Sequence, residues 1–210
     1  MRIENSHQGF TLIETIVAFA VLFGALVGPI ALITHGLSKA RTSQNVLVAA
    51  NLAQEGLELV RAVRENNNLC DILNQQTAYQ WNNNPAGAAP LGTGSNNLYT
   101  FNIASTSQIN CKPPGGSDIL VTTPEPTEDP DCATKPLKLD TNQRYAYSGT
   151  PTPFARCITI CVPPNASPCN ATNDSDIPAS DQMEIITTMS WKEFDQPRSF
   201  ILRERLYNWR

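Results

Sequence analysis

The sequence has few of the residues that soluble enzymes use for chemistry. Only two histidines, His7 and His35, occur among its 210 residues, which excludes most histidine-based zinc sites and catalytic triads. Charged residues make up 16% of the chain, against about 25% in ordinary soluble proteins. The formal net charge of -4 also gives no reason to expect nucleic-acid binding, which depends on clustered lysine and arginine. We therefore expect a protein that is not an enzyme, with no cofactor and no metal.

Charge is almost absent from one long segment near the N-terminus. Residues 10–37 read FTLIETIVAFAVLFGALVGPIALITHGL, with one acidic residue, Glu14, and no lysine or arginine. As an α-helix this segment would be about 42 Å long, more than the ~30 Å hydrocarbon core of a bilayer. A signal peptide is disfavoured, because its apolar part is typically ~7–15 residues and ends in a small-residue cleavage site. The sequence predicts a transmembrane helix over 10–37.

Glu14 is out of place in such a helix. A carboxylate at mid-membrane costs about 2.5–3.5 kcal/mol, so it normally has a partner or a function. Arg2 lies twelve residues back, so the partner would come from another chain or from processing. Residues 1–9, MRIENSHQG, read as a polar leader that ends in Gly9. Cleavage there would create a new α-amino group on Phe10, four residues before Glu14.

The run Gly9-Phe10-Thr11-Leu12-Ile13-Glu14, followed by the apolar segment, resembles the N-terminal signature of type IV prepilins and type II secretion pseudopilins. The resemblance implies that a prepilin peptidase cleaves between Gly9 and Phe10 and methylates the new Phe10 amine. It also implies that Glu14 pairs with the Phe10 amine of a neighbouring pilin or pseudopilin in a helical filament. Two buried charges offset their desolvation only when they meet with good geometry, which agrees with this pairing.

The resemblance also implies where the chain resides. The precursor would be a single-pass protein of the cytoplasmic (inner) membrane with a cytoplasmic N-terminus, and would later enter an extracellular or periplasmic filament. Lys39 and Arg41, at the far end of the apolar segment, favour the opposite orientation by the positive-inside rule. We follow the motif, because the charge bias amounts to only one or two residues.

The helix is expected to continue beyond the membrane as an amphipathic segment over 38–66, ending near Asn66–Asn68. Apolar residues spaced 4, 3, 4 and 3 define a one-sided stripe: Val46, Ala50, Ala53, Leu57 and Val60. We expect this stripe to carry the chain's own globular domain; the alternative is that it packs on neighbouring helices. Pro29 lacks a backbone donor, which predicts a helix kink or local melting near Ala25–Pro29.

Residues 67–210 are expected to form an exported, β-rich head with long irregular loops over 66–97 and 112–136. The fold class is therefore α+β and pilin-like: a long N-terminal helix packed on a C-terminal antiparallel sheet. The last two strands should form a hairpin around Glu193–Pro197. The predicted strands are Leu98–Ala104, Arg144–Tyr147, Ala155–Val162, Gln182–Trp191 and Arg198–Tyr207. Pro153-Phe154-Ala155-Arg156, Ser190-Trp191 and Leu206-Tyr207-Asn208-Trp209 also resemble minor prepilins with larger heads.

Six cysteines follow the membrane segment, and an even number in an exported domain indicates disulfides, with 15 possible pairings: Cys70, Cys111, Cys132, Cys157, Cys161 and Cys169. On one strand, Cys157 and Cys161 would lie about 13 Å apart, beyond the ~7 Å Cα limit, so each must bond elsewhere. We predict Cys161–Cys169 and Cys111–Cys132. A zinc site is disfavoured, because no C-x₂-C pair occurs.

The expected function is that of a minor pilin or pseudopilin, a non-catalytic subunit of a type IV pilus-like or type II secretion filament. Its partners would be other pilins or pseudopilins, the prepilin peptidase and the membrane. The alternative is a membrane-anchored, disulfide-stapled binding or adhesion module. The acidic clusters lack EF-hand spacing, so we interpret them as solvated loops: Glu125, Glu128, Asp129 and Asp131, then Asp174, Asp176 and Asp181.

Overall fold

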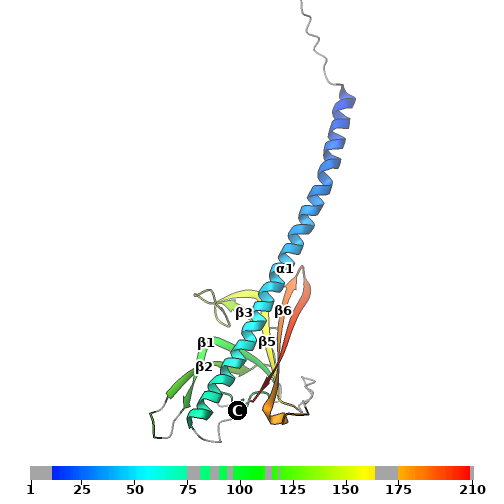
Figure 1. Cartoon of the computed structure of the whole chain (residues 1–210). Helices are drawn as coiled ribbons and strands as arrows, with labels where there is room; N and C mark the ends of the chain where they lie inside the picture. The colour runs from blue at the N-terminus through cyan, green and yellow to red at the C-terminus, as the bar shows by residue number, and fades with distance from the viewer. Residues whose placement is uncertain are drawn as a thin grey trace, which may run out of the picture. The chain divides into compact units, whose positions relative to one another are not determined.

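The structure is a computed structural model that describes residues 11–74, 81–85, 90–93, 97–111, 115–117, 119–163 and 175–208. The chain divides into two compact units, Met1–Asn45 and Val46–Arg210. A long helix, α1 (Leu12–Asn74), begins in the first unit and ends in the second (Figure 1). The second unit also contains an antiparallel β-sheet, so the predicted α+β fold class is confirmed.

In the first unit, α1 is an apolar helix with its side chains exposed. The helix runs without a break from Leu12 through Pro29, so the local melting predicted near Ala25–Pro29 does not occur in this structure. A proline in a helix removes one i to i-4 hydrogen bond, but the flanking bonds can keep the helix continuous. The kink stays a prediction.

In the second unit, one face of α1 packs against the sheet, as the stripe predicted. Ala53, Leu57 and Val60 are buried, which confirms the expectation that the stripe carries its own globular domain. The buried face of the helix is turned about the helix axis from the predicted stripe: Val46 is 39% exposed and Ala50 is only half-buried. The other buried apolar positions on this face are Ala49, Leu52, Val63 and Cys70.

The helix ends at Asn74 and not near Asn66–Asn68, so the predicted end was too early. Asparagine is a weak helix former, but here tertiary contacts override the propensity. Asn67 is fully buried, and its side-chain amide donates to the carbonyl oxygens of Trp81 (3.1 Å) and Asn83 (2.8 Å). Cys70 then bonds to a strand of the sheet and fixes the last helical turns.

All pairings in the seven-stranded sheet are antiparallel. The strands are β1 (Leu98–Cys111), β2 (Ile119–Glu128), β3 (Pro136–Leu139), β4 (Tyr145–Ala146), β5 (Thr150–Cys161), β6 (Gln182–Glu193) and β7 (Gln196–Tyr207). β5 is central: β6 pairs along one side, and β1 and β3 share the other. β2 and β7 each pair with a single strand, and a short 3-10 helix, η1 (Ala179–Asp181), precedes β6.

The predicted hairpin is confirmed, since β6 and β7 pair in register from Gln182↔Tyr207 to Glu193↔Gln196. The other predicted strands exist with shifted bounds, and Leu98–Ala104 extends to Cys111. The prediction that 112–136 is irregular was wrong, because β2 lies within it. Pro124 and Pro126 argued against a strand, but an edge strand tolerates proline, which has no N–H to donate.

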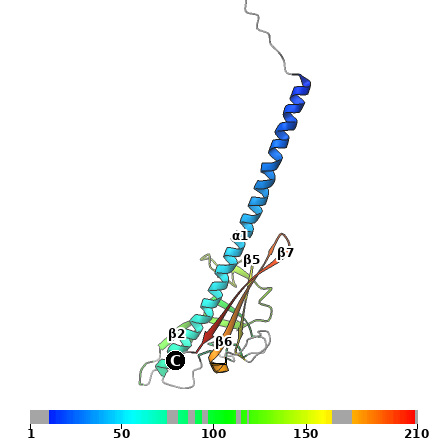
Figure 2. The same cartoon turned by 45° about the vertical axis from the view of Figure 1, so that its right-hand side comes forward.

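The core of the second unit lies between α1 and the sheet, in two apolar clusters. The first contains Leu57, Val60 and Val63 of α1 together with Trp81, Leu91, Tyr99, Phe101, Ile158, Ile160, Met183, Ile185 and Leu206. The second contains Ala49, Leu52 and Ala53 of α1 together with Leu137, Phe154, Met189 and Trp191. Figures 1 and 2 show residues 46–74 of α1 running across the strands that supply these side chains.

Gly56 lets α1 approach the sheet closely, between the two clusters. A Cβ added there would lie 2.9 Å from Thr187 Cγ2 and 3.3 Å from both Arg156 Cδ and Ile158 Cδ1. Arg156 is consequently buried, with 1% of its surface exposed. Its Nη1 donates to the Leu52 carbonyl oxygen at 3.3 Å and lies 3.4 Å from the Glu55 carboxylate. The helix thus supplies both the close contact and the groups that compensate the buried charge.

Two disulfides join cysteines that both lie in the described part of the chain, Cys70–Cys111 and Cys132–Cys157, so the predicted Cys111–Cys132 bridge was wrong. In the β1–β2 hairpin, Cys111 pairs with Ile119, whereas Glu128, four residues before Cys132, pairs with Tyr99. The two cysteines are therefore at opposite ends of a hairpin about 30 Å long. Cys157 and Cys161 do share β5 and are each disulfide-bonded elsewhere, as expected. Cys169 lies outside the described residues, so Cys161–Cys169 stays a prediction.

Removing the partner of the buried arginine should destabilise the head. The Glu55→Ala variant leaves the Arg156 guanidinium without its nearby carboxylate, which should lower the free energy of unfolding by about 1–3 kcal/mol. The matched Glu58→Ala variant removes an exposed carboxylate three residues away and should change it by less than about 1 kcal/mol. Denaturant unfolding monitored by circular dichroism in detergent compares the two. Equal effects would show that Glu55 does not compensate Arg156.

Candidate functional site

The N-terminal turn of α1 holds the residues that the sequence singled out. Gly9 and Phe10 lie outside the described residues, and Glu14 is the third residue of the helix. The Glu14 backbone N–H donates to the Thr11 carbonyl oxygen at 3.1 Å and lies 3.4 Å from the Thr11 hydroxyl oxygen. Thr11 therefore caps the helix, which begins at Leu12 because threonine satisfies one of the free N–H groups of the first turn.

The Glu14 carboxylate is exposed on this turn. Its position in the first turn is favourable, because the helix macrodipole stabilises negative charge there. Thr11 and Glu14 also have the spacing of a capping box, in which the glutamate accepts from the cap residue's own N–H. Among the described residues, however, the Glu14 side chain has no hydrogen-bond or ion-pair partner. The turn therefore presents a carboxylate at the start of an apolar helix.

As far as Leu37, the rest of this helix carries no lysine, arginine or acidic residue and is largely apolar around its circumference, whereas residues 38–45 of the first unit are polar. None of its most apolar stretch is buried within the chain. α1 is thus the one helix, among the described residues, that is long and apolar enough to cross a membrane. Large apolar side chains from Leu12 to Leu37 are 48–78% exposed. Together they form a larger exposed apolar surface than soluble monomers normally have. A bilayer or other apolar helices would cover this surface.

Two glycines lie one turn apart on this segment. A Cβ added at Gly24 or Gly28 would meet no heavy atom within 4 Å, so neither glycine serves a close contact inside the chain. The G-x-x-x-G spacing is typical of apolar helices that pack closely on one another. This spacing is visible in the sequence, so the two glycines could have been identified there.

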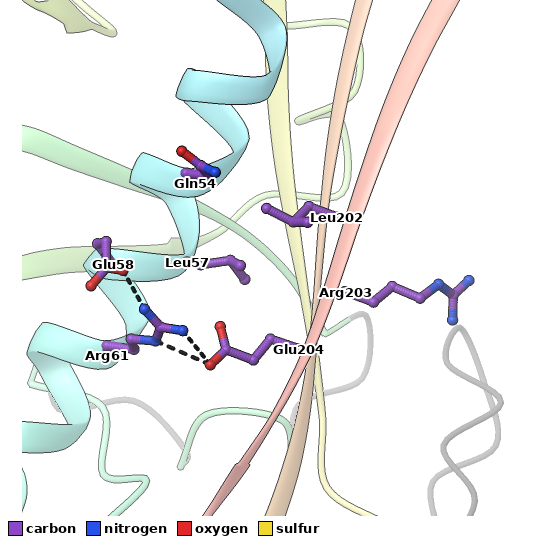
Figure 3. A pocket seen from close by; sticks show the side chains of 7 residues that line it. All are labelled: Gln54, Leu57, Glu58, Arg61, Leu202, Arg203 and Glu204. Atoms are coloured by element: carbon purple, nitrogen blue, oxygen red, sulfur yellow. Dashed lines mark hydrogen bonds and ion pairs between the residues drawn. The ribbon is translucent and has the colours of Figure 1, made fainter.

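The head has a groove between α1 and β7 (Figure 3). Its volume is about 540 Å³, and its lining residues are Gln54, Leu57, Glu58, Arg61, Leu202, Arg203 and Glu204. The Arg61 side chain points from the helix to the strand, and its Nε donates to Glu204 Oε1 at 3.1 Å. Arg61 also forms ion pairs with Glu58 and Glu204. Figure 3 shows Arg203 extending away on the other side of β7.

An ion pair across the groove, between Arg61 and Glu204, links α1 to β7. The hydrogen bond with Glu204, and then the negative charges of Glu204 and Glu58, raise the pKa of Arg61 above its usual value against the effect of burial. Arg61 therefore stays charged, and both glutamates that line the groove, Glu58 and Glu204, form ion pairs with it. The arrangement holds β7 against α1.

The acidic clusters do not converge on a metal site within the described residues, where no group of three or more His, Cys, Asp or Glu is placed to hold an ion. Asp129 instead accepts from Lys135 Nζ at 2.8 Å, and Asp181 accepts from the Asn208 side-chain amide at 3.1 Å. Asp174 lies outside the described residues. These carboxylates fix local loop and strand ends.

Comparison of this chain with protein-family models, with curated proteins and with solved structures gives no match.

Proposed function

We propose that this chain is a minor type IV pilin or a pseudopilin, a non-catalytic subunit that assembles through its N-terminal helix. One observation carries the proposal: a lone carboxylate, Glu14, is exposed in the first turn of a helix that is otherwise apolar from Leu12 to Leu37. A simple membrane anchor gains nothing from this carboxylate. The prepilin-like run from Gly9 to Glu14 gives it a use, as the partner of a new amine on another copy or homologous subunit.

The energetics favour assembly by charge pairing. A carboxylate costs about 2.5–3.5 kcal/mol at mid-membrane depth and less near the ends of the span, where Glu14 would lie, so the membrane-inserted precursor has some reason to leave the lipid. In a filament, the methylated Phe10 amine of a neighbour would lie against Glu14, and each charge would compensate the desolvation of the other. The Gly24 and Gly28 face would allow close packing of apolar helices once the precursor has been extracted.

The head supports export. Its disulfides, Cys70–Cys111 and Cys132–Cys157, are typical of oxidising compartments and rare in the cytosol. The head would therefore lie outside the cytoplasm and the leader inside it, before the subunit enters an extracellular or periplasmic filament. This orientation requires the motif to prevail over the positive charges of Lys39 and Arg41.

We favour a minor subunit over a major one because the head has long connecting segments, although these are shorter than the loops expected over 66–97 and 112–136. Part of each segment expected to be irregular is regular, because α1 extends to Asn74 and β2 occupies Ile119–Glu128. The chain still takes 23 residues from α1 to β1 and 17 from β5 to η1. Connections of more than about 12–15 residues are uncommon and often functional, which favours a subunit present in few copies.

The alternative function is a membrane-anchored binding or adhesion module that acts as a single subunit. The same apolar helix and disulfide-bonded head suit it. It differs from a pilin in keeping its N-terminal leader and in having no need of Glu14.

Mass spectrometry of the mature N-terminus tests the proposal directly. With a prepilin peptidase present, we expect the chain to begin at Phe10 with one added methyl group. The Gly9→Leu variant should block cleavage and leave the 210-residue precursor in the membrane. Gln8→Leu is the matched control and should be processed normally. An intact Met1 on the wild-type chain, in cells that process other prepilins, would refute the proposal and favour the anchored module.

Replacing Glu14 should separate insertion from assembly. Glu14→Val removes the charge, so membrane insertion and cleavage should be unchanged, because valine is less costly in lipid. The amount in filaments should fall by more than about tenfold, since the amine of the neighbouring subunit loses a buried partner worth several kcal/mol. Thr15→Val, which removes a polar group from the same turn without a charge, should assemble normally. Immunoblots of sheared filaments measure both, and normal assembly of Glu14→Val would end the pairing model.

Subunit counting tests the minor assignment. Quantitative mass spectrometry of sheared filaments should find this chain at a small fraction of the dominant subunit. Because tip or priming subunits occur a few times per filament, its ratio to the dominant subunit should also fall as filaments lengthen. A ratio near one, independent of length, would make it a major subunit.

A further inference from the structure

The β6–β7 hairpin turns through two residues that are unusual for their position. Glu193 pairs with Gln196, so Phe194 and Asp195 alone form the loop. Their φ angles are +50° and +61°, in the left-handed region. Two-residue hairpin loops of this kind are dominated by Asn-Gly, Asp-Gly and Gly-Gly, because these residues adopt positive φ with little strain. A bulky aromatic residue with positive φ is a genuine outlier.

The fold gains no packing in return for this strain. Phe194 is 67% exposed, whereas the next aromatic residue along β6, Trp191, is 5% exposed. Elsewhere in the head, Asn97 and Gln143 occupy left-handed positions with polar side chains. Asparagine or glycine at position 194 would form the same turn with less strain. The ring therefore adds little packing to the fold, and strained residues cluster at sites that bind ligands or switch conformation.

The turn lies at the end of the head where the helix enters. Met183 and Leu206, at the far end of the hairpin, pack with Leu57 to Val63 of α1. Met189 and Trp191, close to the turn, pack with Ala49, Leu52 and Ala53. The hairpin thus runs along α1 toward Val46, and the turn lies beyond the last of these contacts. Figures 1 and 2 show the β6–β7 turn at this end in both views.

Chain connectivity keeps this end of the head near a membrane. Only residues 38–45 separate Leu37, the last residue of the apolar segment, from Val46, the first residue of the head. A chain of this length spans at most about 30 Å, even when fully extended. If residues 10–37 cross a bilayer, Val46 therefore cannot lie more than about 30 Å from Leu37, and lipid is an occupant that the chain itself keeps near the head.

The charges beside Phe194 suit an interface without favouring anionic lipid. Lys192 is exposed, and Arg198 is 55% exposed with its Nε 3.6 Å from the Glu193 carboxylate. Long cationic side chains can follow an inserted ring and keep their charged ends at the headgroups. Asp195 and Glu193 offset these two charges, so the strip from 192 to 198 has no net charge. Contact would depend on the aromatic ring.

We propose that Phe194 inserts its ring at the headgroup–acyl boundary of the bilayer that residues 10–37 cross, and so holds the head against the membrane in the precursor. This rests on the membrane-inserted precursor of the proposed function. The contact would have to break when the subunit is extracted, so it belongs to the stored state and not to the filament.

Fluorescence quenching by brominated phosphatidylcholine tests the contact in the full-length chain reconstituted into nanodiscs. The Phe194→Trp variant adds an indole at the turn, and its added emission over wild type should lose more than half its intensity with bromine near the headgroup. Bromine deep in the acyl chains should quench it less. Adding anionic phosphatidylglycerol should change neither result.

Thr122→Trp is the matched control at the other end of the head. Thr122 is exposed on β2, and its carbonyl oxygen accepts from the Asn66 side-chain amide at 3.3 Å. Asn66 lies twenty residues beyond Val46, about 30 Å further along the helix. Its added emission should not be quenched. If the chain incorporates into nanodiscs but the Phe194→Trp emission is equally unquenched, the ring faces water or another protein and the inference is wrong. If the chain does not incorporate at all, the proposed function fails as well.

A stability measurement tests the alternative that the Phe194 ring stabilises the fold itself. The Phe194→Asn variant should raise the midpoint of thermal unfolding of the full chain in detergent, because asparagine tolerates positive φ. A lowered midpoint would show that the ring stabilises the fold itself, and would overturn the inference even if quenching were seen.

Discussion

The head depends on how closely α1 can approach β5 and β6. At Gly56 the helix backbone meets Thr187, Arg156 and Ile158 with no room for a side chain. That contact buries the Arg156 guanidinium, which would be very costly if it were left alone. Glu55 and the Leu52 carbonyl oxygen, on the same stretch of helix, compensate it. Five consecutive residues of α1 thus create a buried charge and also stabilise it, with an apolar cluster on each side.

Much of this fold could be predicted from the sequence, because its main signals are local. The apolar run, the stripe on α1 and the alternation of the last hairpin each need only the period of a helix or a strand. The predictions that were wrong concerned features that depend on tertiary contacts. The buried amide of Asn67 and the bond from Cys70 extend α1, while the edge position of β2 makes room for its prolines. The disulfide pairing failed for the same reason, since an unforeseen strand separated Cys111 from Cys132.

The candidate site divides in the same way. Glu14 could be found from the sequence, because a single acidic residue within an apolar segment is visible there directly. The Arg61–Glu204 ion pair and the burial of Arg156 could not, because nothing in the order of residues shows that a helical arginine faces a strand 143 positions away. The left-handed backbone at Phe194 was equally hidden. The sequence placed a turn at Glu193–Pro197, but a Phe-Asp turn looks ordinary until its φ angles are known.

Glu14 and Phe194 share a physical logic despite lying in different units of the chain. Glu14 suits the dipole of the first helical turn but is costly where that helix enters lipid, and Phe194 is an exposed ring on a strained turn. A chain that functioned alone in one solvent would have no use for either. In the proposed function, Glu14 meets a positive group of another molecule, and in the further inference Phe194 meets an apolar phase beside the head. Both proposals place the chain first in lipid, while it is stored, and then among other subunits, once it is assembled.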